Sequence, residues 1–149
     1  MTEFTEVVRI ECPTAGVWRA LTIPAEVVQW DTGIVAPLDA PVDYPRPGQH
    51  VRWRYRLGPV PMILHDRPTE VVVERTLRSS IQLGPFSFDE VYTLAAEGTA
   101  QTVLSAWLSL SCNLPLVGRW LEQWPGASLA RSTVRQSLAA IKLHCETEK

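Results

Sequence analysis

The strictest pattern in the sequence is the segment 51–57, in which apolar and basic side chains alternate. Its apolar members are Val51, Trp53, Tyr55 and Leu57, and each residue between them is an arginine. A period of two places alternate side chains on opposite faces of a β-strand. The segment is therefore predicted to be a strand with one apolar face and one basic face.

Further segments have the length and composition of strands and are separated by short turns. They are residues 4–12, 62–71, 76–83, 86–94 and 100–112. In the last of them, alternate residues again divide into an apolar set and a serine-rich set, so one side is expected to be buried. With 51–57 these segments predict an antiparallel meander.

Helical spacing occurs after the first strand and again in the last third of the chain. Pro13 is placed to open one short helix, and Pro24 a second that ends near Trp30. Near the C-terminus an apolar stripe is interrupted by Pro125-Gly126 and then resumes on a helix of about five turns. The order predicts one α+β domain over residues 1–149, in which a curved antiparallel sheet of about six or seven strands wraps around the long C-terminal helix.

Composition and short motifs exclude several functional classes. The net charge of −2 argues against a nucleic-acid partner. No apolar stretch approaches the length of about 18 residues that a membrane span needs, and the acidic N-terminus does not resemble a signal peptide, so a cytoplasmic protein without membrane insertion is expected. No phosphate loop, nucleotide fingerprint or metal-ligand spacing is present, so we expect no metal and no cofactor. Cys12, Cys112 and Cys145 are expected to be buried free thiols.

Three phrases resemble a known superfamily in their order along the chain. They are Ile-Glu-Cys-Pro-Thr-Ala-Gly-Val-Trp-Arg-Ala-Leu at 10–21, His-Asp-Arg-Pro-Thr-Glu-Val at 65–71 and Leu-Pro-Leu-Val-Gly-Arg-Trp-Leu at 114–121. The chain thereby resembles the START-like (SRPBCC) superfamily, especially its polyketide cyclase/dehydrase and lipid-transport branch. The resemblance implies a helix-grip fold with an apolar cavity between sheet and helix. The sequence departs from the pattern at Pro68, which suggests a strand edge or a bulge.

Glu90 is the most informative candidate for chemistry. It lies in a stripe whose other members, Phe86, Phe88, Tyr92 and Leu94, are expected to face the interior. A buried carboxylate is costly unless it is paired, protonated or beside a wet cavity. We therefore interpret Glu90 as a general acid/base or a ligand hydrogen-bond acceptor; a structural ion pair is the competing interpretation.

The sequence His65-Asp66-Arg67 allows two orientations, because neighbouring side chains in a strand point to opposite faces. In relatives similar to the pollen allergens, an Asp at the matching position lines the cavity, which favours an inward Asp66. An inward His65 would instead be the natural proton shuttle near neutral pH. The candidate catalytic residues are Glu90, Asp66, Tyr92 and His65.

A set of apolar and aromatic side chains on inward faces is predicted to bind the ligand. Its members are Trp53, Tyr55, Phe88, Leu108, Trp120 and Trp124. Such a lining favours flat or cyclic ligands, although each residue alone could simply fill the core. The arginines between 52 and 56 are interpreted as a solvated face rather than a phosphate site.

Two functions from different classes fit these features. The first is a cofactor-independent cyclase/dehydratase that acts on an aromatic or polyketide-like ligand. The second is a non-catalytic carrier of a lipid or another hydrophobic metabolite. A protein-interaction domain is a third possibility, for which Trp107 on the serine-rich face is the one indication. The expected partner is a small hydrophobic ligand, and the chain is expected to be a monomer or a homodimer.

Overall fold

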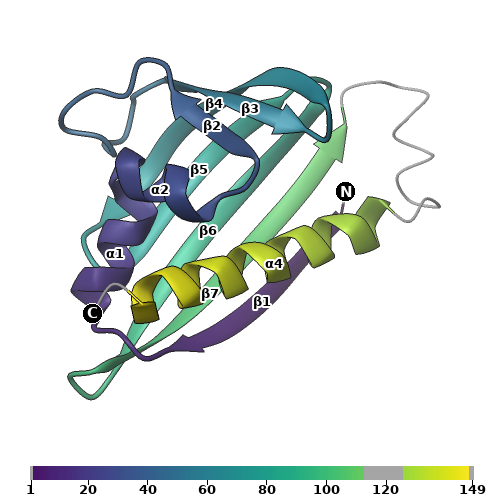
Figure 1. Ribbon diagram of the computed structural model, residues 1–149. Coiled ribbons are helices and arrows are strands. Elements are labelled where there is room, and N and C mark those ends of the chain that lie inside the picture. The colour runs from purple at the N-terminus through teal and green to yellow at the C-terminus, as the bar shows by residue number, and fades with distance from the viewer. Residues whose placement is uncertain (1, 113–125, 148–149) are drawn as a thin grey trace.

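The computed structural model describes residues 2–112 and 126–147, with side chains for 2–111 and 130–147, and Figure 1 shows the arrangement of the helices and strands. The strands are β1 (Thr2–Ile10), β2 (Ile34–Pro37), β3 (Val51–Leu57), β4 (Val60–Val72), β5 (Thr76–Leu83), β6 (Phe86–Glu97) and β7 (Gln101–Cys112). The helices are α1 (Thr14–Thr22), α2 (Pro24–Trp30) and α4 (Gly126–Thr147).

All seven strands form one antiparallel sheet in the order β1-β7-β6-β5-β4-β3-β2. The sheet is curved, and the three helices lie on its concave side (Figure 1). Helix α4 runs along β1 and also contacts β7, α1 and α2. This confirms the predicted α+β helix-grip fold, with a curved sheet around the C-terminal helix and two short helices after the first strand.

The strongest sequence patterns predicted the element boundaries best. The expected ranges for α2, β3 and β5 coincide with the observed ones. Strand β2 was not predicted, because it has only four residues, includes Pro37 and pairs with β3 through a shifted register. The predicted helical stripe before Pro125 lies outside the described residues.

Pro68 illustrates how the sheet accommodates a residue that donates no backbone hydrogen bond. It is fully buried on β4, and the pairing of β4 with β5 shifts between Pro68 and Glu70. A bulge at this point confirms the interpretation made from the sequence.

The core occupies the concave side, between the sheet and the helices. Helix α4 contributes Leu138, Ile141 and Cys145 to it, all of which are buried. Cys12 and Cys145 are free and buried, as expected, whereas the side chain of Cys112 is outside the described set. Among the residues that the structure describes, none of the helices is long and apolar enough to span a membrane.

Candidate functional site

The register of the sheet decides which side chains share the concave face. Residues directly opposite each other on paired antiparallel strands point to the same side. Asp66 on β4 lies opposite Val51 and Ile81, which are both buried in the core. Glu90 on β6 lies opposite Ser79 and Leu108, which are also buried. Both carboxyl groups therefore lie on the concave face.

Asp66 is held by two donors that bind the same oxygen. The Tyr44 hydroxyl donates to Asp66 Oδ2 at 2.7 Å, and Trp53 Nε1 donates to the same atom at 3.2 Å. The rings of Tyr44 and Trp53 meet edge to face, with centroids 5.8 Å apart. Only 6% of Asp66 is exposed, and its other oxygen, Oδ1, is buried with no hydrogen-bond partner among the described residues. Burial raises the pKa of Asp66, while the hydrogen bonds from Tyr44 and Trp53 oppose the rise.

Glu90 lies in a more strongly perturbed environment. Burial, followed by the charges of Asp66 and Asp31, raises its pKa from 4.5 to about 8, and the Tyr92 hydroxyl, which donates a hydrogen bond to it, opposes the rise. Its side chain is nevertheless half-buried rather than fully buried. At neutral pH the protonated form of Glu90 is therefore the main one.

A third acid, Asp31, acts on Glu90 together with Asp66 in the described structure. Asp31, at the end of α2, accepts hydrogen bonds from the backbone N–H groups of Gly33 at 3.0 Å and Ile34 at 3.4 Å. Burial raises its pKa as well. The charged groups that act on Glu90 within the described set are Asp66 and Asp31, and both disfavour its ionisation. Such a surface can hold a proton on one carboxyl group and accept one on another.

The predicted ligand-binding residues divide between described and undescribed parts of the chain. Trp53 is 2% exposed, Leu108 is buried, and Tyr55 and Phe88 are half-buried, all on the concave face. These four residues share the surface of Asp66 and Glu90. Trp120 and Trp124 lie outside the described residues.

His65 lies on the other face of β4. It is opposite Arg52 and Gln82, and its Nδ1 is 2.8 Å from His50 Nε2. The alternation of the strand therefore resolves the two orientations left open by the sequence, with Asp66 inward and His65 outward. The alternative of an inward His65 that acts as a proton shuttle does not agree with this placement, because its side chain points away from the concave face.

Sequence reasoning missed Tyr44, Asp31 and Ser79. Tyr44 and Asp31 come from irregular segments between α2 and β3, where no period of two or 3.6 assigns a side chain to a face. Ser79 lies on β5, and the alternation of that strand could have placed it inward beside Leu77 and Ile81. Within the described residues, no three His, Cys, Asp or Glu side chains are grouped as a metal site.

Comparison with known proteins gives matches at the level of structure. The sequence matches no family model, and no curated protein is a significant sequence match. A START superfamily protein from Mycobacterium smegmatis superposes with a TM-score of 0.80 at 15% identity, over 99% of both chains. TTHA0849 from Thermus thermophilus gives a TM-score of 0.76 at 16% identity, also over 99% of both chains.

A third similar structure is the di-domain ARO/CYC BexL from the BE-7585A biosynthetic pathway. Its TM-score is 0.76 at 14% identity, and the match covers 98% of this chain and 47% of that one. Sequence identities this low establish the architecture rather than the activity. The superpositions cover 98–99% of this chain, and the chain therefore has the START-like helix-grip fold.

Proposed function

We propose that the chain binds a small hydrophobic, aromatic or polyketide-like ligand in an internal cavity on its concave face and acts as a cofactor-independent cyclase/dehydratase. The observation that carries the proposal is the pair Asp66 and Glu90, a buried and a half-buried carboxyl group with different surroundings on one surface. The unpartnered Oδ1 of Asp66 adds to it, because a buried acceptor without a partner is costly unless a ligand or a proton satisfies it.

Their surroundings assign different roles to the two carboxyl groups. Asp66 accepts hydrogen bonds from Tyr44 and Trp53 that favour its ionised form, so it is the better base. Glu90 has a pKa of about 8 and carries a proton at pH 7, so it is the better acid. Two carboxyl groups whose environments separate their proton affinities are a recurring arrangement for acid–base chemistry.

An aldol closure followed by loss of water uses both carboxyl groups and returns each of them to its starting protonation state. Asp66 Oδ1 removes a proton from a carbon between two carbonyl groups, this carbon bonds to a third carbonyl carbon, and Glu90 gives its proton to the oxygen of that carbonyl. The ionised Glu90, which still accepts the Tyr92 hydrogen bond, then takes the second proton of the same carbon. Asp66 returns its proton to the departing hydroxyl group, and water leaves.

The aromatic side chains on the same surface support a flat or cyclic ligand. Tyr55 and Phe88 are half-buried and offer aromatic contact area on the same face as the two carboxyl groups. The similarity of the fold to the ARO/CYC protein BexL is consistent with a substrate that cyclises. A wall of apolar rings also keeps water away from a reactive carbonyl chain.

The test begins with native mass spectrometry of the purified protein to identify any small molecule that co-purifies. That molecule, together with a panel of aromatic and poly-carbonyl compounds, is incubated with wild type, Glu90→Gln and Asp66→Asn. Loss of a general acid or base should lower kcat by about 100-fold or more. Asp89→Asn is the matched control, because Asp89 is the exposed neighbour of Glu90 on the opposite face of β6.

The pH profile separates a catalytic Glu90 from a structural one. If Glu90 acts as the acid, kcat falls as the pH rises through about 8, because the proton that it donates is then lost. Turnover by Glu90→Gln at the wild-type rate would contradict the assignment. Tight ligand binding without product in the wild type would instead make the chain a carrier of a hydrophobic metabolite.

A further inference from the structure

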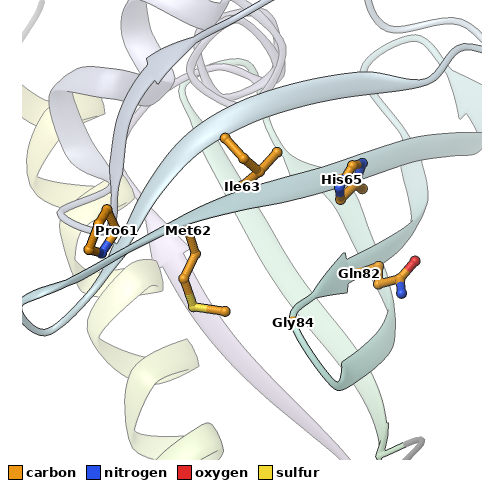
Figure 2. A pocket seen from close by; sticks show the side chains of 6 residues that line it. All are labelled: Pro61, Met62, Ile63, His65, Gln82 and Gly84. Carbon is orange, nitrogen blue, oxygen red and sulfur yellow. The ribbon is translucent and has the colours of Figure 1, made fainter.

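A hollow lies beside β4, and its lining residues Pro61, Ile63, His65 and Gln82 point to the outer face of the sheet, opposite to Asp66, whereas Met62 reaches it from the concave side. Its volume is about 410 Å³, and Pro61, Met62, Ile63, His65, Gln82 and Gly84 line it (Figure 2). Strand β4 pairs with β5 from Leu64 onward, so its first residues continue beyond the end of β5. This stagger leaves room between β4 and the turn at Gly84. A volume in this range is typical of sites for small molecules.

Three arginines of β3 lie next to the residues of β4 that line the hollow. Arg52, Arg54 and Arg56 on β3 lie directly opposite His65, Ile63 and Pro61 on β4, and all six point to the outer face. Arg52 is paired with Asp39 at 2.8 Å. With the described residues, Arg54 and Arg56 form no ion pair, and both are exposed. Two guanidinium groups are thus available beside an apolar floor.

A hydrogen-bonded histidine pair lies at the end of the hollow. His50 Nε2 and His65 Nδ1 are 2.8 Å apart, so the N–H group of one ring donates a hydrogen bond to the ring nitrogen of the other. The charged groups that face His65 are His50, Arg67, Arg52 and Asp39, and the first three are cations or become cations on protonation. Burial, and then these neighbours, lower the pKa of His65, whereas Asp39 opposes the shift. A negative charge placed here would relieve the repulsion among these groups.

We propose that this outer hollow is a second binding site, which takes a small organic anion. The apolar part of the anion rests on Pro61 and Ile63, and its carboxylate or phosphate group meets Arg54, Arg56 and the histidine pair. The planar fork of each guanidinium group matches the geometry of both head groups and can donate two parallel hydrogen bonds. The groups that would contact the anion, Arg54, Arg56 and His65, lie on the opposite face from Asp66 and Glu90, so the site does not depend on the function proposed for the interior.

The first experiment measures the binding of phenyl phosphate and benzoate by NMR titration of the full chain, with benzyl alcohol as the neutral probe. We expect the two anions to shift the backbone signals of His65, Gln82 and Gly84, and benzyl alcohol to bind far more weakly. Arg54→Gln and Arg56→Gln should each weaken the binding of both anions by about tenfold, the effect of one lost charge-assisted hydrogen bond. Both positions are exposed, so the fold should not change.

Arg19→Gln is the matched control, since Arg19 is an exposed arginine on α1. If Arg19→Gln weakens binding as much as Arg54→Gln does, the anions respond only to overall charge and the proposal is wrong. Equal binding of benzyl alcohol, or shifts confined to residues of the concave face, would overturn it as well.

A second readout uses the histidine pair. Benzoate stays ionised between about pH 5.5 and 7.5, because the pKa values of carboxylic acids lie near 4. Its affinity should therefore rise severalfold as the pH falls through this range and His65 gains a proton. The substitution His65→Gln should remove most of this pH dependence while leaving a weaker, arginine-dependent site. Unchanged pH dependence in His65→Gln would show that the pair does not contact the anion.

Discussion

Asp66 and His65 are neighbours in β4, and burial shifts their pKa values in opposite directions. On the concave face, burial raises the pKa of Asp66, and the hydrogen bonds from Tyr44 and Trp53 partly offset the rise. On the outer face, burial together with nearby cations lowers the pKa of His65. In each case burial favours the neutral form of the side chain, although the two groups carry opposite charges when ionised.

The two faces differ in the charges of the neighbouring side chains. The concave face brings Asp31, Asp66 and Glu90 together with tyrosines, and the cations of β3 point the other way. Protonation is therefore the way in which the repulsion among the inner carboxyl groups is reduced. On the outer face, a bound anion would reduce the repulsion among the arginines and histidines. One alternating strand can thus supply a proton-handling surface on one side and an anion-binding surface on the other.

Stability should separate the two faces most clearly at neighbouring positions of β3. Trp53→Ala removes a buried ring and its hydrogen bond to Asp66, and should lower the free energy of unfolding by about 4 kcal/mol. Arg54→Ala, on the outer face, should change it by no more than about 0.5 kcal/mol. Urea denaturation of both variants measures the difference. A loss below about 1 kcal/mol for Trp53→Ala would show that the concave face is not a packed surface at this point.

The pH dependence of stability tests whether Glu90 is protonated in the folded protein. Between pH 4.5 and about 8 the folded chain keeps the Glu90 proton and the unfolded chain does not. The folded state binds more protons, so this group makes the free energy of unfolding fall by up to about 1.4 kcal/mol for each pH unit as the pH rises.

Glu90→Gln should remove that component of the slope, while Asp89→Asn, on the outer face, should leave it in place. Urea denaturation at several pH values in this window provides the measurement. Identical slopes for wild type and Glu90→Gln would mean that the interior tolerates an ionised Glu90, and the contrast between the two faces would be lost.

Tyr44→Phe isolates a single hydrogen bond of the inner surface. The loss of the donor to Asp66 Oδ2 should lower the free energy of unfolding by about 2 kcal/mol, which is usual for a bond to a charged acceptor. The pKa of Asp66 should rise further, because that bond favours its ionised form. Denaturation and NMR titration of Asp66 provide the two measurements.

Tyr55→Phe is the matched control, since no hydrogen bond of the Tyr55 hydroxyl to a described residue contributes to its pKa. An equal loss in both variants would attribute the effect to the general burial of a hydroxyl group rather than to the Asp66 contact.

The strands could be predicted because their environment is periodic. The alternation in 51–57 placed Trp53 and Tyr55 on the inner face, and the stripe around Glu90 placed that carboxyl group with them. Both assignments depend only on the alternation of side chains at positions two residues apart, and this pattern can be read directly from the sequence. The orientation of 65–67 could not be settled in this way, because apolar neighbours supported both faces. The pairing of β4 with β3 and β5 settled it.

The parts of the site that lie outside regular strands were not predictable. Tyr44 reaches Asp66 from a loop, across 22 positions of the chain, and Asp31 acts on Glu90 from the end of a short helix. Such contacts depend on the path of the whole chain rather than on a local repeat. The outer hollow has the same origin, since it results from the stagger between β4 and β5 rather than from the residues of either strand alone.

The smallest expected effect concerns the tryptophan of the outer face. The guanidinium carbon of Arg78 lies 5.9 Å from the ring centroid of Trp107, near the limit at which a cation and a ring attract each other. At an exposed site this contact contributes about 0.5–1 kcal/mol, so Arg78→Gln should destabilise the protein by no more than that. Arg67→Gln, also exposed on the outer face, serves as the control for the loss of one positive charge. A cost of more than about 2 kcal/mol for Arg78→Gln would place a well-packed contact on the outer face, and stability would then no longer distinguish Trp107 from Trp53.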